Sequence, residues 1–226
     1  MFDRLKLLIG EDCFNKIQNA NILVVGVGGV GGECIISLVR SGIVNISFID
    51  FDVVTLSNIN RQVVAYNSTI GMKKVDVIEK MVKDINPLCN TLKYDLYLDN
   101  DNINDIFDKT IYDFVIDCCD SKETKKAIIK ECLNRDISFI SSMGTGNKLN
   151  PDDLYITDIR KTSIDPLARI IRKWVNDEKI KGKVPVLCSK EVPIHSGKVV
   201  ASNSFVPNSA GLLISSYVIK KIIGKI

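Results

Sequence analysis

A glycine-rich turn and an acidic pair lie close together near the start of the chain. Asp50 and Asp52 follow the turn by about 20 residues, the offset at which an acid binds a ribose in dinucleotide sites. Glycines without a Cβ, and unpaired N–H groups at a helix start, let a phosphate approach the backbone closely. The glycines of the turn are Gly26, Gly28, Gly29 and Gly31. These residues predict a nucleotide site, and NAD is one candidate.

Basic residues on the following segment narrow the chemistry. Arg61 lies in the run Ser57 to Gln62, and Lys74 follows Gly71. Fixed cations stabilise the charge that builds on a departing pyrophosphate, whereas NAD has no leaving group to neutralise. Asp120 comes directly after an apolar run, where α/β sheets bind ligands, and its carboxylate could hold Mg²⁺. The pattern favours nucleotidyl transfer from ATP over hydride transfer.

Alternating strand and helix patterns must position these residues. Apolar runs predict strands near residues 22–25, 91–98, 114–118, 137–142 and 154–159, and a βαβ unit from Ile22 to Asp50 whose second strand leads into the run 48–52. Helical spacing predicts helices over residues 5–18, after 30, over 75–85, over 122–133, from 166 and from 208. Leu8 and Ile17 are expected on the apolar side of the first helix. Residues 53–69 and the acidic stretch 99–108 are expected to be loops.

The alternation predicts an α/β fold, a Rossmann-like and mainly parallel sheet with helices on both faces. Residues 184–190 and 198–204 are expected to extend it as antiparallel strands in the C-terminal part. An apolar stripe of a helix that starts at Asp165-Pro166 comprises Leu167, Ile170, Ile171, Trp174 and Val175. We expect a single domain over residues 1–226, with an ATP-binding half (1–146) and a substrate-facing half (147–226).

Composition places the chain among ordinary globular proteins. It has 226 residues, of which 46% are hydrophobic and 25% charged. No signal peptide opens it, and the most apolar stretch, residues 210–219, is too short to span a bilayer, so no firm membrane association is expected. The seven cysteines are odd in number and form no C-x-x-C pair, which argues against structural zinc and for a reducing cytoplasm. Cys118 and Cys119 are expected in the core.

Positive charge gathers in one segment. Residues 160–183 contain eight Lys or Arg and three acids, a net charge of +5, whereas the whole chain carries +3. A cationic patch on an otherwise near-neutral protein is what a polyanionic partner requires. The solvated face of an amphipathic helix is an equally open interpretation.

Two further residues could carry chemistry. Cys188 lies near Lys190, which could lower the thiol pKa if the side chains meet, although a structural strand cysteine is the favoured interpretation. His195 is the only histidine and lies in a glycine-containing turn without a neighbouring acid, so a loop position is favoured over a catalytic one.

Several motifs together resemble the ThiF/MoeB/HesA superfamily, the adenylating enzymes related to ubiquitin-activating enzymes. The resemblance covers roughly residues 1–146. Besides the glycine turn, it rests on Asp50-Phe51-Asp52, the run Ser57 to Gln62, Gly71 to Lys74, Ile85-Asn86-Pro87 and Asp117 to Asp120.

The resemblance implies binding of ATP and Mg²⁺ and adenylation of a carboxylate. It implies that Asp50 holds the ribose, that Asn58, Arg61 and Lys74 grip the phosphates, and that Asp120 holds the metal. It also matches Arg4 to the arginine that family homodimers insert into the partner subunit's site.

Features of the second half narrow the resemblance to the tRNA threonylcarbamoyladenosine dehydratases within the superfamily. The matching stretches are Gly144-Thr145-Gly146, Asn150-Pro151, Ile156-Thr157-Asp158, Lys161-Thr162 and Asp165 to Ala168. The implied partner is a tRNA carrying threonylcarbamoyladenosine, whose side chain is cyclised with ATP. Two alternatives stay open: an adenylyltransferase for a ubiquitin-like sulfur-carrier protein, and an NAD-binding Rossmann module. Whether a sulfur-transfer partner protein exists is also open.

Overall fold

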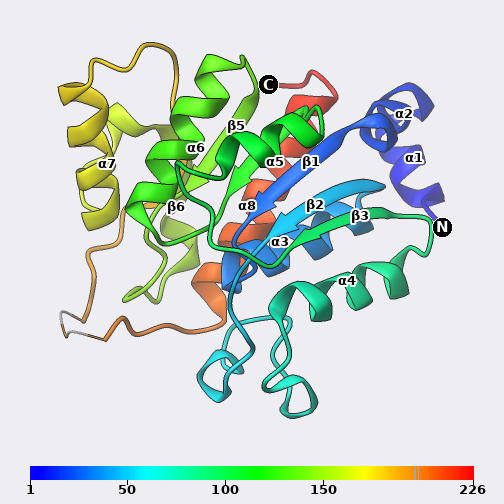
Figure 1. Cartoon of the computed structure of the whole chain (residues 1–226), viewed down its shortest axis with the longest axis horizontal. Helices are drawn as coiled ribbons and strands as arrows, with labels where there is room; N and C mark the ends of the chain where they lie inside the picture. Colours follow the sequence, from blue (N-terminus) through cyan, green and yellow to red (C-terminus); the bar gives the residue numbers. More distant parts are fainter. Residues whose placement is uncertain (196, 198) are drawn as a thin grey trace.

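A mainly parallel sheet forms the framework of the chain (Figure 1). The computed structural model describes residues 1–195, 197 and 199–226, and over these residues the sheet has seven strands in the order β3-β2-β1-β4-β5-β7-β6. The strands are β1 Asn21–Val25, β2 Asn45–Ile49, β3 Asn90–Tyr94, β4 Phe114–Asp117, β5 Ser138–Ser142, β6 Leu154–Asp158 and β7 Pro185–Ser189. All neighbours pair in parallel except β6 and β7. The predicted α/β class is confirmed.

Helices cover both faces of this sheet. They are α1 Asp3–Ile9, α2 Glu11–Asn19, α3 Gly29–Arg40, α4 Lys74–Ile85, α5 Ile103–Lys109, α6 Lys122–Asn134, α7 Pro166–Asp177 and α8 Phe205–Ile222. Because side chains alternate along a strand, Ile22 and Val24 of β1 join the core formed with α2, α3, α4 and α8. Leu23 and Val25 join the core formed with α5, α6 and α7.

Helix α8 anchors the C-terminal part of the chain to the N-terminal part. Ala210, Ile214 and Val218 are fully buried, which confirms a core helix in this apolar stretch. α8 packs closely on α3, since a Cβ at Gly211 would lie 2.5 Å from the carbonyl oxygen of Val30. No helix among the described residues is long and apolar enough to cross a membrane.

The N-terminal region differs from its prediction. Instead of one helix over 5–18, α1 and α2 are separated at Gly10, whose φ of +85° suits glycine. Ile17 is buried as expected, but Leu8 is 78% exposed, because the break turns α1 away from the core. The expected loop 99–108 was also wrong, since α5 forms there and buries Ile106 and Phe107. Acidic residues occupy exposed positions of α5, and their polarity makes the segment resemble a loop in the sequence.

The C-terminal extension is simpler than predicted. β6 is the antiparallel strand, whereas β7, within the expected run 184–190, pairs in parallel with β5. Residues 199–204 form no strand, and Lys198 lies outside the described residues. α7 begins after Asp165 as expected, but Ile170 of its apolar stripe is 44% exposed, because the buried face is centred on Ile171 and Val175.

Candidate nucleotide site

A cavity of about 460 Å³ lies at the carboxyl ends of β1, β2 and β4. The chain runs from β1 outward to β2 and returns to β4 on the other side of β1, so this is the point where the strand order reverses. Ligands of open α/β sheets bind in the crevice at such a point. The expected ligand site of the fold therefore coincides with the glycine turn.

The glycine turn forms one wall of the cavity. Gly26 has a φ of +93°, and a Cβ there would lie 2.9 Å from the backbone of Cys118. A Cβ on Gly31 would lie 1.8 Å from the carbonyl oxygen of Gly26, so Gly31 packs the helix onto the turn and does not itself line the cavity. Gly28 and Gly29 line the cavity where α3 begins. The first N–H groups of α3 are therefore available to an anion.

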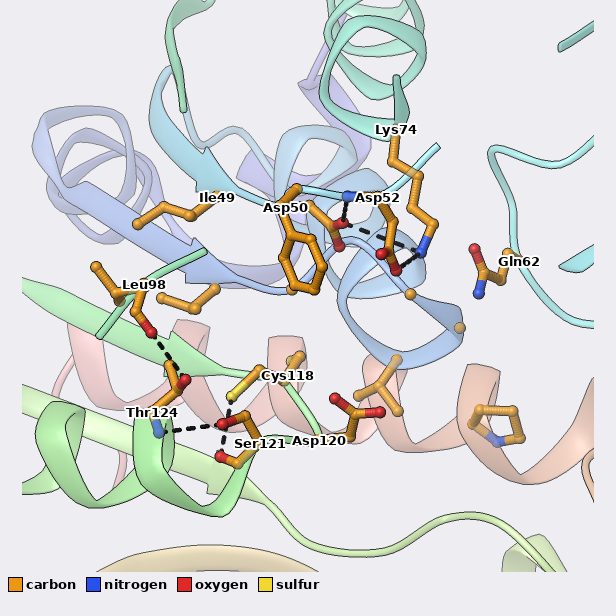
Figure 2. A pocket seen from close by; sticks show the side chains of 18 of the residues that line it. Ile49, Asp50, Asp52, Gln62, Lys74, Leu98, Cys118, Asp120, Ser121 and Thr124 are labelled. Atoms are coloured by element: carbon orange, nitrogen blue, oxygen red, sulfur yellow. Dashed lines mark hydrogen bonds and ion pairs between the residues drawn. The ribbon is translucent and has the colours of Figure 1, made fainter. Parts of the chain in front are cut away.

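Two carboxylates and a buried ammonium form the second wall (Figure 2). Asp50 accepts hydrogen bonds from the backbone N–H groups of Val27 (2.6 Å) and Asp52 (2.8 Å). Burial raises the pKa of Asp50, although Lys74 and the two N–H donors oppose the rise. The Lys74 ammonium lies 2.7 Å from a carboxylate oxygen of Asp52 and 4.0 Å from one of Asp50.

Lys74 is the first residue of α4 and is only 5% exposed. A buried cation costs several kcal/mol of desolvation unless it is paired. Its pairing with Asp52, which is itself half exposed, leaves the ammonium at the cavity surface. The arrangement suits an ammonium that exchanges a carboxylate for a phosphate.

The segment between β2 and α4 supplies a third group of polar residues. Asn58 is buried and its side-chain oxygen accepts a hydrogen bond from the N–H of Thr55, 3.1 Å away. Arg61 donates to the carbonyl oxygen of Ser57 and to the side chain of Asn60. Both residues line the cavity. Arg61 is therefore positioned by its own turn, with the remaining guanidinium donors available to a ligand.

Gln62 lines the same cavity, and sequence reasoning did not single it out. Its side chain is 8% exposed, and its Oε1 has no hydrogen-bond partner among the described residues. Most buried polar atoms are paired, so an unpaired one facing a cavity is suited to a ligand. The available signal was its position at the end of the motif run Ser57 to Gln62.

Asp120 faces the second wall from the opposite side of the cavity (Figure 2). The segment that carries it is supported by Asp117, which is fully buried and accepts from Lys125, Ser141 and the N–H of Cys119. The Lys125 ammonium lies 3.1 Å from the Asp117 carboxylate. A buried ion pair thus positions the turn that presents Asp120.

Other predicted residues differ in how they relate to the cavity. Cys118 and Cys119 pack against the two cores as expected, but they are partly exposed and also line the cavity. Arg4 lies on exposed α1 and does not line the cavity of its own chain, and a role in a partner subunit stays a prediction. Exposed His195 lies in the loop after β7 and outside the cavity.

Cys188 is a buried strand residue. It is 1% exposed, and burial raises the pKa of its thiol, a rise that a hydrogen bond with Tyr155 opposes. The Lys190 ammonium lies over the Tyr155 ring instead. The hypothesis that Lys190 lowers the pKa of Cys188 is therefore wrong.

Residues from the second half of the chain and from the loop after β3 close the cavity. Thr145 and Ser202 line it, and the Tyr97 hydroxyl lies 2.7 Å from the Ser121 hydroxyl. Sequence reasoning named none of these three as site residues. They sit on irregular segments, where no period indicates which side chain faces a ligand.

Comparisons with known proteins match most of this chain. The model of the ThiF family matches residues 2–151. The tRNA threonylcarbamoyladenosine dehydratase of Bacillus subtilis is 37% identical, over 96% of this chain and 92% of that protein. The protein of the same name in Escherichia coli is 34% identical, over 80% of this chain and 69% of that one. The crystal structure of the E. coli enzyme, TcdA, in complex with ATP superimposes with a TM-score of 0.93 and 32% identity, covering 99% of this chain and 94% of that one.

Proposed function

The chain belongs to the ThiF family, and we propose that it is an ATP-dependent tRNA threonylcarbamoyladenosine dehydratase. In this proposal it adenylates the threonylcarbamoyl carboxylate of a modified tRNA adenosine and then cyclises it. The relative that bears this name is similar over nearly the whole of both chains. The similar E. coli structure holds ATP.

One observation carries the proposal: a single cavity brings together a glycine turn, the cations Arg61 and Lys74, and the carboxylates of Asp50 and Asp120. A hydride-cofactor site needs only the turn and an acid for the ribose. The two cations fit a reaction that expels pyrophosphate, because they stabilise charge that appears in the transition state.

Each side chain has a role in this proposal. Asp50 accepts hydrogen bonds from the ribose hydroxyls, with its carboxylate oriented by the N–H groups of Val27 and Asp52. Asn58, Arg61 and Lys74 bind the phosphates together with the N–H groups at the start of α3. Asp120 would hold Mg²⁺, which would neutralise phosphate charge. Among the described residues, no group of three metal-binding side chains gathers there.

The chemical steps balance without a covalent enzyme intermediate. A carboxylate oxygen of the substrate bonds to the α-phosphorus of ATP, and the bond to the pyrophosphate oxygen breaks. A nucleophile within the same side chain then attacks the acyl carbon and expels AMP. Effective molarities of intramolecular reactions reach roughly 10⁵–10⁸ M, so ring closure needs no enzyme nucleophile. Buried Cys188 fits this scheme as a structural residue.

Further parts of the proposal concern organisation. Residues 1–146 supply most of the cavity, including Thr145, and residues 147–226 contribute Ser202 and Pro207. We propose a homodimer in which Arg4 reaches the site of the partner subunit. We also place the protein in the cytoplasm, because its seven cysteines are all free in the structure.

Mass spectrometry of tRNA nucleosides from cells that lack this gene tests the proposal. We expect the cyclic nucleoside to disappear, to return with the wild-type gene, and not to return with Asp120→Asn. Persistence of the cyclic nucleoside in the deletion strain would refute the proposal. Release of pyrophosphate only when a ubiquitin-like carrier protein is supplied would select the adenylyltransferase. Calorimetry that detects NAD but no ATP would select the Rossmann module.

A further inference from the structure

The basic segment 160–183 differs from the rest of the chain in the density of its cations, since it holds eight Lys or Arg and three acids. Some surface cations elsewhere face carboxylates, as Lys73 does with Asp95 and Arg135 with Asp108. Within the segment, Arg160 bonds to Asp158, and Arg172 donates to the carbonyl oxygen of Thr162. The other six cations are exposed and form no ion pair among the described residues. They are Lys161, Arg169, Lys173, Lys179, Lys181 and Lys183.

Helix α7 carries part of this charge on its outer face. Ala168, Ile171 and Val175 are buried against the core. Arg169 and Lys173 are four residues apart, so they lie one turn apart on the opposite face. Twelve helical residues span about 18 Å. Lys179, Lys181 and Lys183 follow in the connection to β7, which folds back against Arg160.

The start of α7 is attached to the rim of the nucleotide cavity. Asp165 caps the helix by accepting from the N–H of Ala168 (2.8 Å) and also accepts from the N–H of Gly144 (3.3 Å). Gly144 precedes Thr145, which lines the cavity. Lys148 pairs with Asp165 at 2.7 Å, and both side chains are 1% exposed. The first residues of α7 are therefore bonded to the segment that carries Thr145 into the cavity, and α7 lies at the edge of the molecule (Figure 1).

We infer that this row of unpaired cations binds the phosphate backbone of the RNA whose modified nucleoside enters the cavity. The inference rests on the proposed function and assigns a surface to it. A nucleoside in the cavity leaves the adjoining backbone outside. The charged row belongs to the helix whose N-terminal cap, Asp165, is bonded to Gly144 beside cavity-lining Thr145. Lysine and arginine contacts to phosphates position an RNA without reading its sequence. Binding along the row releases counterions and is therefore salt-dependent.

The test compares Arg169→Ala/Lys173→Ala/Lys181→Ala with a matched triple variant, Lys80→Ala/Lys220→Ala/Lys225→Ala. The matched cations are also exposed, and they lie on α4 and at the C-terminal end of α8, away from α7. A tRNA transcript is the probe, and its Kd is measured by fluorescence anisotropy over a series of salt concentrations. ATP binding is measured in parallel by calorimetry.

We expect the α7 variant to bind the transcript at least about tenfold more weakly at 0.1 M salt, with the slope of log K against log salt reduced by about 2 to 3. The matched variant should bind tRNA as the wild type does, and both variants should bind ATP normally. Equal weakening in both triple variants would overturn the inference, as would an unchanged Kd in the α7 variant. If the Kd of the α7 variant is unchanged and the wild type cyclises tRNA, the RNA-binding role of this surface is refuted but the proposed function stands. Wild-type protein that neither binds the transcript nor cyclises tRNA carrying threonylcarbamoyladenosine would refute both the proposed surface and the proposed function. Anionic lipid vesicles, bound in preference to tRNA and lost in the α7 variant, would assign the row to a membrane instead.

Discussion

Removing the Lys148 ammonium should uncouple α7 from the cavity rim and destabilise the protein. In Lys148→Met the Asp165 carboxylate stays buried, with the N–H groups of Gly144 and Ala168 as its only partners among the described residues. The Lys148 ammonium also donates to the carbonyl oxygen of Gly144, so the substitution releases the loop as well. Breaking a buried ion pair by removing one partner costs about 3–5 kcal/mol. For a chain of this length that corresponds to a fall in Tm of roughly 6–20 °C.

The double variant Lys148→Met/Asp165→Asn separates charge from packing. Asn caps a helix about as well as Asp, and the pair of substitutions leaves no buried charge unpaired. We therefore expect the double variant to be more stable than Lys148→Met alone, with a coupling of about 1–3 kcal/mol between the two sites.

Urea unfolding followed by tryptophan fluorescence provides the assay. Trp174 is the only tryptophan and lies on α7, so the signal reports the element that the pair anchors. A second transition or a changed slope in Lys148→Met would show α7 loosening before the rest of the chain. Loss of less than about 1 kcal/mol in Lys148→Met, with no recovery in the double variant, would refute the reasoning.

Three further predictions concern the cavity and its neighbours. Lys74→Met should abolish pyrophosphate release, measured by an enzyme-coupled assay. Its unfolding midpoint should stay within a few degrees of the wild type, because its partner at 2.7 Å, Asp52, is half exposed and stays solvated without the ammonium. A fully active variant would exclude the role. ATP affinity should fall as the pH falls through the raised pKa of Asp50, because the protonated carboxyl loses an acceptor for the ribose hydroxyls. Calorimetry between pH 7 and pH 4.5 tests this prediction. The variant Asp50→Asn should bind ATP weakly and without this pH dependence. Cys188→Ala should keep ring closure and lose about 1 kcal/mol of stability from the small cavity it leaves; adenylation without ring closure would show instead that the thiol is catalytic.

Sequence periodicity predicted the regular elements of the fold, in which the position of a residue determines whether its side chain faces the core. The run from Ile22 to Val25 alternates between two cores, and both are filled by helices with a 3.6-residue period. These strands can be recognised in the sequence, because burial on both faces of a parallel sheet requires continuous apolar runs. The same reasoning failed at α5, a short helix whose acidic exposed face outweighs its buried Ile106 and Phe107. At β7 it predicted the strand and its antiparallel pairing, which β6 provides, but not the parallel pairing with β5, because pairing direction depends on where the chain returns to the sheet.

The residues of the candidate site also fall into a predictable and an unpredictable group. Gly26, Asp50 and Lys74 lie at element boundaries, where a strand ends or a helix starts, and their positions follow once those elements are known. Tyr97, Thr145 and Ser202 reach the cavity from irregular segments, and their facing depends on long-range contacts. Ser202 illustrates this, because its carbonyl oxygen accepts from Asn60, 142 residues earlier in the chain. No local pattern encodes such a contact.

Buried ion pairs connect these two classes of residue. Asp117 with Lys125 holds the turn of Asp120, and Asp165 with Lys148 holds the loop of Thr145, so each pair fixes an irregular segment at the cavity. A sequence gives no reason to bury these four charged residues, since an isolated lysine or aspartate is far more often solvated. Their burial costs desolvation that only good geometry offsets. Asp117 precedes cavity-lining Cys118, and Asp165 accepts from Gly144 beside Thr145, so we interpret both pairs as positioning the loops at the cavity.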